Sequence, residues 1–508
     1  MKRLLAALAI ALCGSGVDGL RAQTTYTWTG AGSNSYDISA ADNWLGGVAP
    51  AGLATDTLVF GKSLNPVPFF TASQTVGNII YTGQNTSTWL MSNTPALVVT
   101  LAGNIASSPL FSYFGSLSAT LALTNAPHMM NIEGSFVYLM GDISGAGSLV
   151  KTGGATLGLK GNNTFTGGVT INQGTVMVGT STALGAGSVT FNGGILANES
   201  ETPVTLTNNF LLGTNPTFGL DYNPGAALTL TGTLAAIGST ANLSIVGDTP
   251  LYLSGNIVDG TAGATTYLFS GGGLAVLAGT NTYTGGTTIG SAMSGGGVLF
   301  ATSTAIPAVG TIKSTSQGYA GLLVPSAAAT FVSSLDPTGF TGTLGFDTPP
   351  GNPAQTFSAA INLTNLPGTA RVGTLTQAIL TGEITPRSAT TPYSFGGAGW
   401  LYLSDAAQSF PLTGTRDLQA STLVPPSGGG KPFMLVVSRG NNTYTGGTSV
   451  SSGGIVFDAV GALPANSAFF LGQPGSYLGH TETDSSLTVA NLVTRLTNGS
   501  YVAESVLG

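Results

Sequence analysis

Short stretches of four or five residues, in which apolar side chains alternate with small polar ones, recur along the chain. In residues 175–178, Val176 and Val178 would point to one side of an extended strand, while Thr175 and Met177 would point to the other. Glycine and asparagine, which supply the backbone conformations of turns, separate such stretches. The pattern therefore predicts an all-β fold of many short strands.

An eight-residue motif occurs three times almost letter for letter: glycine, a variable residue, asparagine, threonine, an aromatic residue, threonine and two glycines. Copy 1 covers residues 161–168, copy 2 residues 279–286 and copy 3 residues 440–447. The fixed positions, in chain order, are Gly161, Asn163, Thr164, Phe165, Thr166, Gly167, Gly168, Gly279, Asn281, Thr282, Tyr283, Thr284, Gly285, Gly286, Gly440, Asn442, Thr443, Tyr444, Thr445, Gly446 and Gly447. The intervals between copies lie near whole multiples of about 23 residues, which is within the size range of one solenoid unit.

The sequence after each copy is also shared. A predicted strand comes first, then a turn containing glycine, a second predicted strand, and an element made of alanine, an aliphatic residue, and glycine or proline. The strands cover 169–171 and 175–178, 287–289 and 298–300, and 448–450 and 455–457, and the third elements are 183–185, 305–307 and 462–464. A weaker signature, L-x-G-x-I, indicates degenerate rungs at 101–105, 139–143, 253–257 and 380–384.

One rung of two or three such strands cannot bury its own inner face. If rungs stack roughly 4.8 Å apart, each pairs its backbone with the next, and the apolar side chains form a continuous column. We therefore expect a right-handed parallel β-helix. The open ends of such a solenoid need caps.

The first residues predict export. Lys2 and Arg3 precede an apolar run over residues 4–12, and a cleavage site follows at Ala22, as in a secretory signal peptide. The run is shorter than the roughly 18 to 20 residues that cross a bilayer, and no later segment reaches that length, so we expect no membrane span.

The single cysteine leaves one alternative open. Lipidation of Cys13 would anchor the mature N-terminus to a membrane, but Leu12 argues against it, because that cleavage needs a small residue before the cysteine. If Cys13 leaves with the signal peptide, the mature chain has no disulfide and no thiol chemistry.

Composition and charge narrow the function. Charged residues make up only 6% of the chain, and acidic residues outnumber basic ones by 20 to 13, which argues against nucleic acid or anionic lipid as a partner. Threonine, serine and asparagine take the place of charges, as suits strands and turns. Such a composition can also describe a disordered linker, but a hydrophobic content of 42% leaves enough to bury in a core.

Residues 147–178, which include copy 1, resemble the autotransporter-associated β-strand repeat, also called the passenger-associated transport repeat. The family motif reads approximately G-S-L-x-K-x-G-x-G-T-L-x-L-x-G-x-N-T-Y-T-G-G-T-x-I-x-x-G-x-L-x-V, and residues 272–300 and 440–457 also follow it well. The resemblance implies an exported surface or secreted bacterial protein, usually an autotransporter passenger, that depends on export machinery and whose repeats favour secretion or folding outside the cell. Autotransporters end in a translocator barrel, whereas residues 504–508 do not show its terminal pattern, so self-transport is not implied.

These features divide the chain into four parts. We expect a signal peptide over 1–22, a cap with the first diverged rungs over 23–140, the β-helix over 141–475, and a diverged rung, complete or truncated, over 476–508. Within the β-helix the three recognisable repeat regions are about 147–195, 272–310 and 433–470.

Two acidic residues are candidates for a catalytic pair, because many enzymes that cut polysaccharides are β-helices. Glu199 and Glu201 would share one face of a strand, with backbone positions about 6.6 Å apart, a separation that suits glycosidic hydrolysis. Pro203 follows them, however, and a solvated turn explains both residues. We expect no catalytic residue here.

A candidate metal site consists of His480, Glu482 and Asp484, which alternate and would face one ion from a strand. Histidine ligands usually come with a second histidine or a cysteine, and the other histidine, His128, is distant in sequence. A hydrophilic loop is the better interpretation, and we expect no metal and no cofactor.

The densest aromatic cluster is a candidate glycan platform. It consists of Tyr393, Phe395, Trp400 and Tyr402, whose rings could form a flat surface for a sugar. The structural alternative is that each ring packs on the equivalent residue of the next rung.

The asparagines of the motif are interpreted as structural. Asn163, Asn281 and Asn442 occupy one position, and asparagine in a turn bonds local backbone and tolerates left-handed φ.

The sequence thus favours an exported, non-enzymatic structural or adhesin-like β-helix at the cell surface, associated with the outer membrane, or outside the cell. An extracellular glycan or a host or neighbouring surface would be its partner. The alternative is a secreted carbohydrate-active or glycan-binding β-helix.

Overall fold

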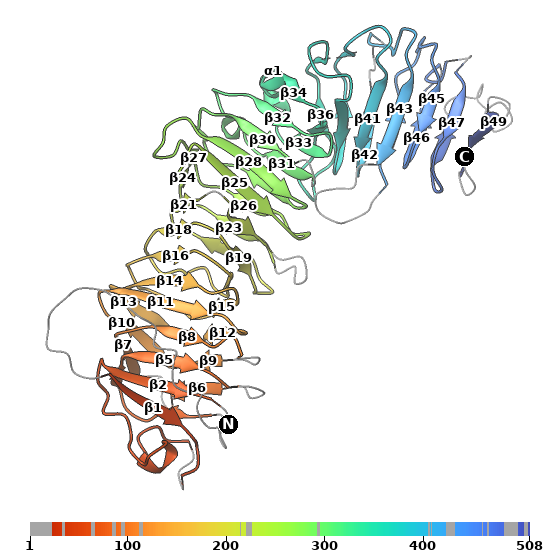
Figure 1. Ribbon diagram of the computed structural model, residues 1–508. Coiled ribbons are helices and arrows are strands. Elements are labelled where there is room, and N and C mark those ends of the chain that lie inside the picture. The colour runs from red at the N-terminus through yellow and green to blue at the C-terminus, as the bar shows by residue number, and fades with distance from the viewer. Residues whose placement is uncertain are drawn as a thin grey trace, which may run out of the picture.

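The chain winds into a curved rod in which each rung of short strands lies on the rung before it (Figure 1). This computed structural model describes residues 23–32, 36–61, 67–83, 88–92, 97–110, 115–213, 215–219, 226–291, 295–404, 407, 409–422, 432–459, 461–464, 467–481, 496–501 and 506–507. The expected signal peptide lies outside them. Strands account for 44% of the structure and helices for 4%, which confirms the predicted all-β solenoid.

Two long sheets form the first half of the rod. Sheet 1 has β1 (Thr24–Trp28), β2 (Asp56–Phe60), β5 (Asn78–Tyr81), β8 (Ile105–Ser107), β11 (Pro127–Ile132), β14 (Ser148–Thr152), β16 (Val169–Ile171), β18 (Val189–Phe191), β21 (Phe210–Leu212), β24 (Leu234–Ala236) and β27 (Ile257–Val258). Sheet 2 has β3 (Phe69–Phe70), β6 (Thr88–Ser92), β9 (Gly115–Leu117), β12 (Val137–Leu139), β15 (Thr156–Leu159), β17 (Thr175–Val178), β19 (Ile195–Asn198), β22 (Thr217–Phe218), β25 (Thr240–Ile245), β28 (Thr266–Gly271), β30 (Thr287–Ile289), β32 (Ile312–Ser314) and β34 (Leu335–Phe340).

Two further sheets carry the rod to its C-terminal end. Sheet 3 has β20 (Val204–Leu206), β23 (Leu228–Leu230), β26 (Leu251–Leu253), β29 (Leu274–Leu277), β31 (Gly296–Phe300), β33 (Gly318–Leu322), β35 (Thr343–Phe346), β38 (Arg371–Thr374), β41 (Tyr393–Gly397), β43 (Leu418–Thr422), β45 (Thr448–Val450), β47 (Phe469–Leu471) and β49 (Leu496–Tyr501). Sheet 4 has β36 (Gln355–Phe357), β39 (Gln377–Leu380), β42 (Trp400–Leu403), β44 (Met434–Val437), β46 (Gly454–Phe457), β48 (Tyr477–His480) and β50 (Val506–Leu507).

The remaining elements are small. Sheet 5 has β4 (Gln74–Val76), β7 (Val98–Leu101), β10 (Thr120–Leu123) and β13 (Ile143–Gly145), and sheet 6 pairs β37 (Ile361–Asn362) with β40 (Ile384–Thr385). The helical segments are η1 (Ala41–Asn43), η2 (Ser303–Ala305), η3 (Pro325–Ala327) and α1 (Ala328–Ser333). No helix among the described residues is long and apolar enough to cross a membrane.

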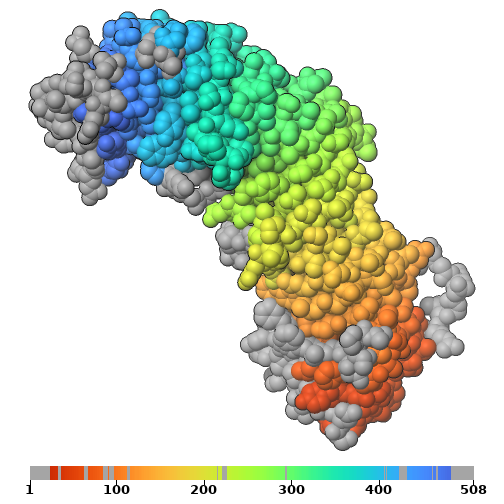
Figure 2. Space-filling model, turned by 180° about the vertical axis from the view of Figure 1, so that it is seen from behind, coloured from red at the N-terminus to blue at the C-terminus, as the bar shows by residue number. Residues whose placement is uncertain are grey.

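Parallel pairing holds successive rungs in register. Leu149 pairs with Val169, and Val169 with Val189, so aliphatic side chains are aligned from rung to rung along sheet 1. The alternation of buried and exposed positions sends every second side chain inward, where the apolar residues form one continuous core. Figure 2 shows the same rod from behind, continuous from its red N-terminal end to its blue C-terminal end.

The N-terminal end of the core is covered. Trp28 on the first strand is only 1% exposed, because the ring of Trp44 packs edge-on against it with ring centroids 5.1 Å apart. The indole N–H of Trp44 donates to the carbonyl oxygen of Ile38 at 2.7 Å, which fixes the covering segment. This stretch lies within the predicted cap region and shields the inner face of the first rung.

Candidate functional site

The asparagine of copy 1 bridges three rungs. Asn163 is buried, its Oδ1 accepts a hydrogen bond from the backbone N–H of Ile143 at 2.8 Å, and its Nδ2 donates to the carbonyl oxygen of Ala183 at 2.6 Å. Ile143 belongs to the preceding rung and Ala183 to the following one. The side chain therefore continues the ladder of hydrogen bonds through a place where no strand is present.

Copies 2 and 3 repeat this geometry. Asn281 accepts from the N–H of Ile257 at 3.0 Å and donates to the carbonyl of Ala305 at 2.7 Å. Asn442 accepts from the N–H of Leu412 at 2.7 Å and donates to the carbonyl of Ala462 at 2.7 Å. We call Asn163, Asn281 and Asn442 the rung-bridging asparagines.

The partners of these asparagines explain the other sequence signatures. Ile143 and Ile257 are the final residues of two L-x-G-x-I signatures, and each supplies the N–H that the asparagine accepts. The alanine carbonyls come from the third elements that follow each copy. Patterns that are separate in sequence are thus parts of one hydrogen-bonded unit.

The sequence-based explanation of the asparagines was wrong in part. All three bond the backbone of neighbouring rungs, and none has a positive φ, although Asn442 also donates to the local carbonyl oxygen of Arg439 at 2.8 Å. Among the described residues other than glycine, the positive φ belongs to Asn441, at 55°, which is the variable position of copy 3.

Copies 1 and 2 each lie against the last strand of a sheet. The N–H groups of Thr164 and Thr166 donate to the carbonyls of Ile143 and Gly145 in β13, which ends sheet 5. The N–H of Thr282 donates in the same way to Ile257 in β27, which ends sheet 1. The motif therefore takes the place of a strand and closes the sheet.

The three copies stand at different corners of the solenoid. Copy 1 leads into β16 of sheet 1, copy 2 into β30 of sheet 2 and copy 3 into β45 of sheet 3. The next strands, β17, β31 and β46, belong to sheets 2, 3 and 4 respectively. Each copy therefore occupies the corner of the solenoid that comes before the next sheet along the path of the chain.

The aromatic residue of the motif fills the core. Phe165, Tyr283 and Tyr444 are at most 1% exposed. The hydroxyl of Tyr283 lies 2.6 Å from Oγ1 of Thr287, and that of Tyr444 lies 2.7 Å from Oγ1 of Thr448, while burial raises the pKa of Tyr283 above its ordinary value.

Copy 1 differs from the other two in both members of that pair. It has Phe165 in place of the tyrosine and Val169 in place of the threonine, and both side chains are buried. Because the hydroxyl and its partner are absent together, no buried hydroxyl is left without a hydrogen bond.

The two glycines of each pair serve different purposes. A Cβ on the first glycine would overlap the backbone of the rung below, at Gly147 for Gly167, at Thr265 for Gly285 and at Arg416 for Gly446. In copies 1 and 2 the second glycine has a positive φ, 82° at Gly168 and 89° at Gly286, which favours glycine.

Copy 3 departs from this geometry. Neither Gly446 nor Gly447 has a positive φ, and a Cβ on Gly447 would find its nearest atom, the carbonyl oxygen of Ala468, at 3.4 Å. In copy 3 the pair therefore requires glycine only at its first position.

The leading glycine also permits close approach. A Cβ on Gly161 would overlap the carbonyl of Gly141, and one on Gly279 would overlap the carbonyl of Gly255. Gly141 and Gly255 are the central glycines of L-x-G-x-I signatures, so glycine faces glycine across adjacent rungs. Gly440 of copy 3 is buried as well.

Sequence reasoning missed two buried cations. The ammonium group of Lys151 donates to the carbonyls of Thr152 and Gly153 at 2.7 Å and of Gln173 at 3.1 Å, and burial lowers its pKa to about 8. The lysine position of the repeat motif was a signal that could have identified it.

Arg439 is the second buried cation. Its guanidinium donates to the carbonyls of Leu380, Gly382 and Phe410, the shortest of these bonds being 2.6 Å. These acceptors lie in earlier rungs, so Arg439 connects the segment before copy 3 to the interior. A single arginine just before the motif gave no sequence signal.

The candidate carboxylate pair is divided. Glu199 forms an ion pair of 2.8 Å with Lys160 and accepts a hydrogen bond of 2.8 Å from the hydroxyl of Tyr138, whereas Glu201 is exposed in the following turn. One carboxylate is occupied by partners from two earlier rungs, and the other points into solvent.

The candidate metal site is not assembled by the described residues. His480 ends β48, where its Nδ1 lies 2.9 Å from the carbonyl oxygen of Thr481, and Glu482 and Asp484 lie outside the described residues. Within the described part of the chain, no group of three or more histidine, cysteine, aspartate or glutamate side chains could hold a metal ion.

The four aromatic residues of the candidate glycan platform do not form one surface. Tyr393 and Phe395 on β41 are buried in the core, because alternation along that strand points them inward. Trp400 and Tyr402 on β42 point outward, and their rings lie 6.3 Å apart at an angle of 22°. The original platform is thereby reduced to two residues.

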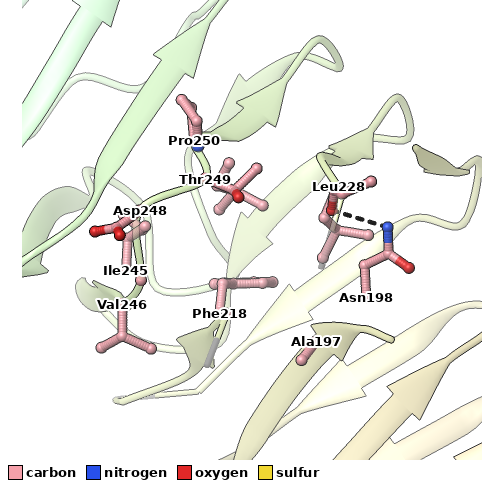
Figure 3. A pocket seen from close by; sticks show the side chains of 13 residues that line it. Ala197, Asn198, Phe218, Leu228, Ile245, Val246, Asp248, Thr249 and Pro250 are labelled. Carbon is pink, nitrogen blue, oxygen red and sulfur yellow. Dashed lines mark hydrogen bonds between the residues drawn. The ribbon is translucent and has the colours of Figure 1, made fainter. Parts of the chain in front are cut away.

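A small pocket lies at a corner between sheets 2 and 3 (Figure 3). Phe218, Leu228 and Ile245 give it apolar walls, and Asn198 stands at its edge. The amide of Asn198 donates to the carbonyls of Ala226 and Thr202 at 2.9 and 3.0 Å and accepts from the N–H of Ser200 at 2.8 Å. Its polar atoms therefore serve the fold.

Comparison with known protein families identifies the three segments that contain the motif. The family model described as the passenger-associated-transport-repeat matches residues 149–178, 270–292 and 434–456, and each segment contains one copy of the motif. No curated protein and no solved structure matches the chain significantly. We conclude that the chain is a parallel β-solenoid that carries three passenger-associated-transport-repeats, the repeat family that its sequence resembles.

Proposed function

We propose that this autotransporter-passenger-like chain is exported to the cell surface or beyond it, where it acts as a structural and adhesin-like β-solenoid rather than as an enzyme. We further propose that its repeats support secretion by making the chain fold stably outside the cell. The repeat family and the solenoid fold support the first part of the proposal.

The geometry of the rung-bridging asparagines carries the second part. Each of them replaces backbone hydrogen bonds at a corner where a strand is absent, and each does so with partners in the rungs on both sides. The stability of a solenoid is approximately a sum over neighbouring rungs. A device that holds three consecutive rungs together would let folding proceed from rung to rung after export.

The carbohydrate-active alternative has less support. A glycosidase would need two carboxyl groups about 5 to 10 Å apart in one groove. Glu199 is engaged by Lys160 and Tyr138, and Glu201 lies in an exposed turn.

An export assay tests the proposal. The full chain, with an epitope tag, would be produced in a bacterium that exports it, and exported protein would be compared with protein retained inside. We expect the parent chain outside and resistant to protease, and the triple variant Asn163→Ala, Asn281→Ala, Asn442→Ala several-fold less abundant there. Asn162→Thr is the matched control, because copy 2 carries Thr280 at that position. Equal export and protease resistance of the triple variant would contradict the proposed role of the repeats.

A further inference from the structure

We propose that the outer face of sheet 4 around Trp400 and Tyr402 binds an uncharged glycan. This inference rests on the adhesin-like part of the proposed function and names its ligand class. It differs from the four-residue platform expected from the sequence, because the fold removes Tyr393 and Phe395 from the surface and adds residues from neighbouring rungs.

The exposure of Trp400 has no explanation in the packing of the solenoid. Trp28 and Trp44 are 1% and 2% exposed, whereas Trp400 is 47% exposed in the middle of a paired strand. Leu401 and Leu403 already supply the inward-facing side chains of β42. The ring of Trp400 is therefore not part of the core, and its flat apolar face is available to a ligand.

The rings do not form a ladder between rungs. The register neighbours of Trp400 are Gln377 on β39 and Met434 on β44, and those of Tyr402 are Ile379 and Val436. Because none of these neighbours is aromatic, the structural alternative of rings stacked on equivalent rings does not apply here. The two rings instead lie nearly parallel along one strand.

The surroundings fit a ligand without charge. The outward positions of four adjacent strands, β39, β42, β44 and β46, are all uncharged: Gln377, Ile379, Trp400, Tyr402, Met434, Val436, Gly454 and Val456. A carboxylated or sulfated chain would find no cation at these positions. The thioether of Met434 lies over Gly454, where a Cβ would come within 2.7 Å of it. Because Gly454 has no side chain, Met434 can lie flat against the sheet and does not project beside Trp400.

Polar groups for hydroxyl recognition stand at the edges of the rings. Within the described part of the chain, no hydrogen bond occupies the indole N–H of Trp400 or the hydroxyl of Tyr402. The amide of Gln377 is held beside them by a bond of 2.9 Å to the carbonyl of Asn352. The apolar C–H face of a sugar ring would stack on the aromatic rings, while its hydroxyls would reach these groups.

The test uses the purified chain from residue 23 to residue 508. Soluble dextran, mannan and a β-1,3-glucan serve as uncharged probes, and polygalacturonate and heparin serve as anionic ones. Binding is followed by tryptophan fluorescence and by isothermal titration. We expect saturable binding of at least one uncharged probe, and a loss of about tenfold or more in affinity in Trp400→Thr, as one stacked ring is removed.

Controls separate binding from folding and from self-association. Phe470→Thr, which removes another aromatic side chain that is 49% exposed, should leave affinity unchanged, and Trp400→Phe should restore part of it. If Trp400→Thr fails to fold, Tyr402→Thr replaces it. Binding to none of the uncharged probes, stronger binding of the anionic ones, or a dimer in sedimentation that Trp400→Thr abolishes would each overturn the inference. A parent chain that is exported but binds no uncharged probe overturns this inference alone, whereas failure of export overturns the proposed function.

Discussion

The hydroxyl of Tyr283 and Oγ1 of Thr287 form a buried hydrogen bond of 2.6 Å, and copy 1 has neither group, because Phe165 and Val169 occupy the two positions. The pair behaves as one unit of the core: both polar groups are present, or both are absent. Removal of one partner leaves a buried hydroxyl without a hydrogen bond, which costs about 1 to 3 kcal/mol.

The first prediction follows from this pair. Thr287→Val should lower the free energy of unfolding by about 1 to 3 kcal/mol, and the double variant Tyr283→Phe with Thr287→Val should recover most of the loss. Chemical denaturation of the parent, both single variants and the double variant measures this coupling. Strictly additive effects of the two substitutions would show that the pair is not a unit.

The second prediction concerns the glycine pair of copy 3. Gly446→Ala should destabilise the chain, because the new Cβ would overlap backbone atoms of Arg416. Gly447→Ala should be tolerated, since its backbone has an ordinary φ and the nearest atom lies at 3.4 Å. Thermal unfolding and limited proteolysis compare the two variants. Equal sensitivity of both would refute the assignment of close approach to the first glycine.

The same reasoning applies to copy 1, where both glycines are required. Gly167→Val with Gly168→Val should create a protease-sensitive zone near residues 160–190 and leave distant rungs intact, because solenoid contacts extend only to neighbouring rungs.

The variable position of the motif should respond differently in copies 1 and 3. Asn162→Thr should be harmless, whereas Asn441→Thr should be strained by about 1 to 3 kcal/mol, because a β-branched residue is unfavourable at φ 55°.

The third prediction concerns pH and Lys151. Burial lowers the pKa of the folded lysine from 10.5 to about 8, so between these values the unfolded chain holds a proton that the folded chain has released. The free energy of unfolding of the parent therefore rises with pH between about 8 and 10.5. Below about 8 this gain is absent, because the folded and the unfolded chain both hold the proton. Urea unfolding of the parent and of Lys151→Met at pH 7.5, 8.5 and 9.5 measures the difference. The stability advantage of Lys151→Met over the parent should be largest at the lowest pH, and a difference independent of pH would rule out the buried ammonium as its cause.

The fold could be predicted from the sequence because its signals are local. The strands expected at 169–171, 175–178, 287–289 and 448–450 coincide with β16, β17, β30 and β45, and those expected at 298–300 and 455–457 lie within β31 and β46. Alternation and turn residues determine such short strands without knowledge of their neighbours. The family match to the three repeats confirms the resemblance.

The contacts between rungs could not be predicted. The partners of Asn163 are 20 residues away on either side, and they are backbone atoms, so the sequence patterns that contain Ile143 and Ala183 do not reveal that these residues meet the asparagine. The division of the aromatic cluster, in contrast, follows from alternation that the sequence already contains. Tyr393 and Phe395 have the same parity as the inward-facing Leu401 and Leu403, whereas Trp400 and Tyr402 have the opposite parity and point outward.

Amide hydrogen exchange at Ile143 in the variant Asn163→Ala tests the central claim most directly. The backbone N–H of Ile143 donates to the side chain of Asn163, so its protection depends on that side chain. We predict that exchange at Ile143 and at the corner formed by residues 161–168 becomes faster by at least tenfold, while residues 434–456 keep the protection of the parent. Unchanged protection of Ile143 in the variant would contradict the claim that the repeat asparagines hold neighbouring rungs together.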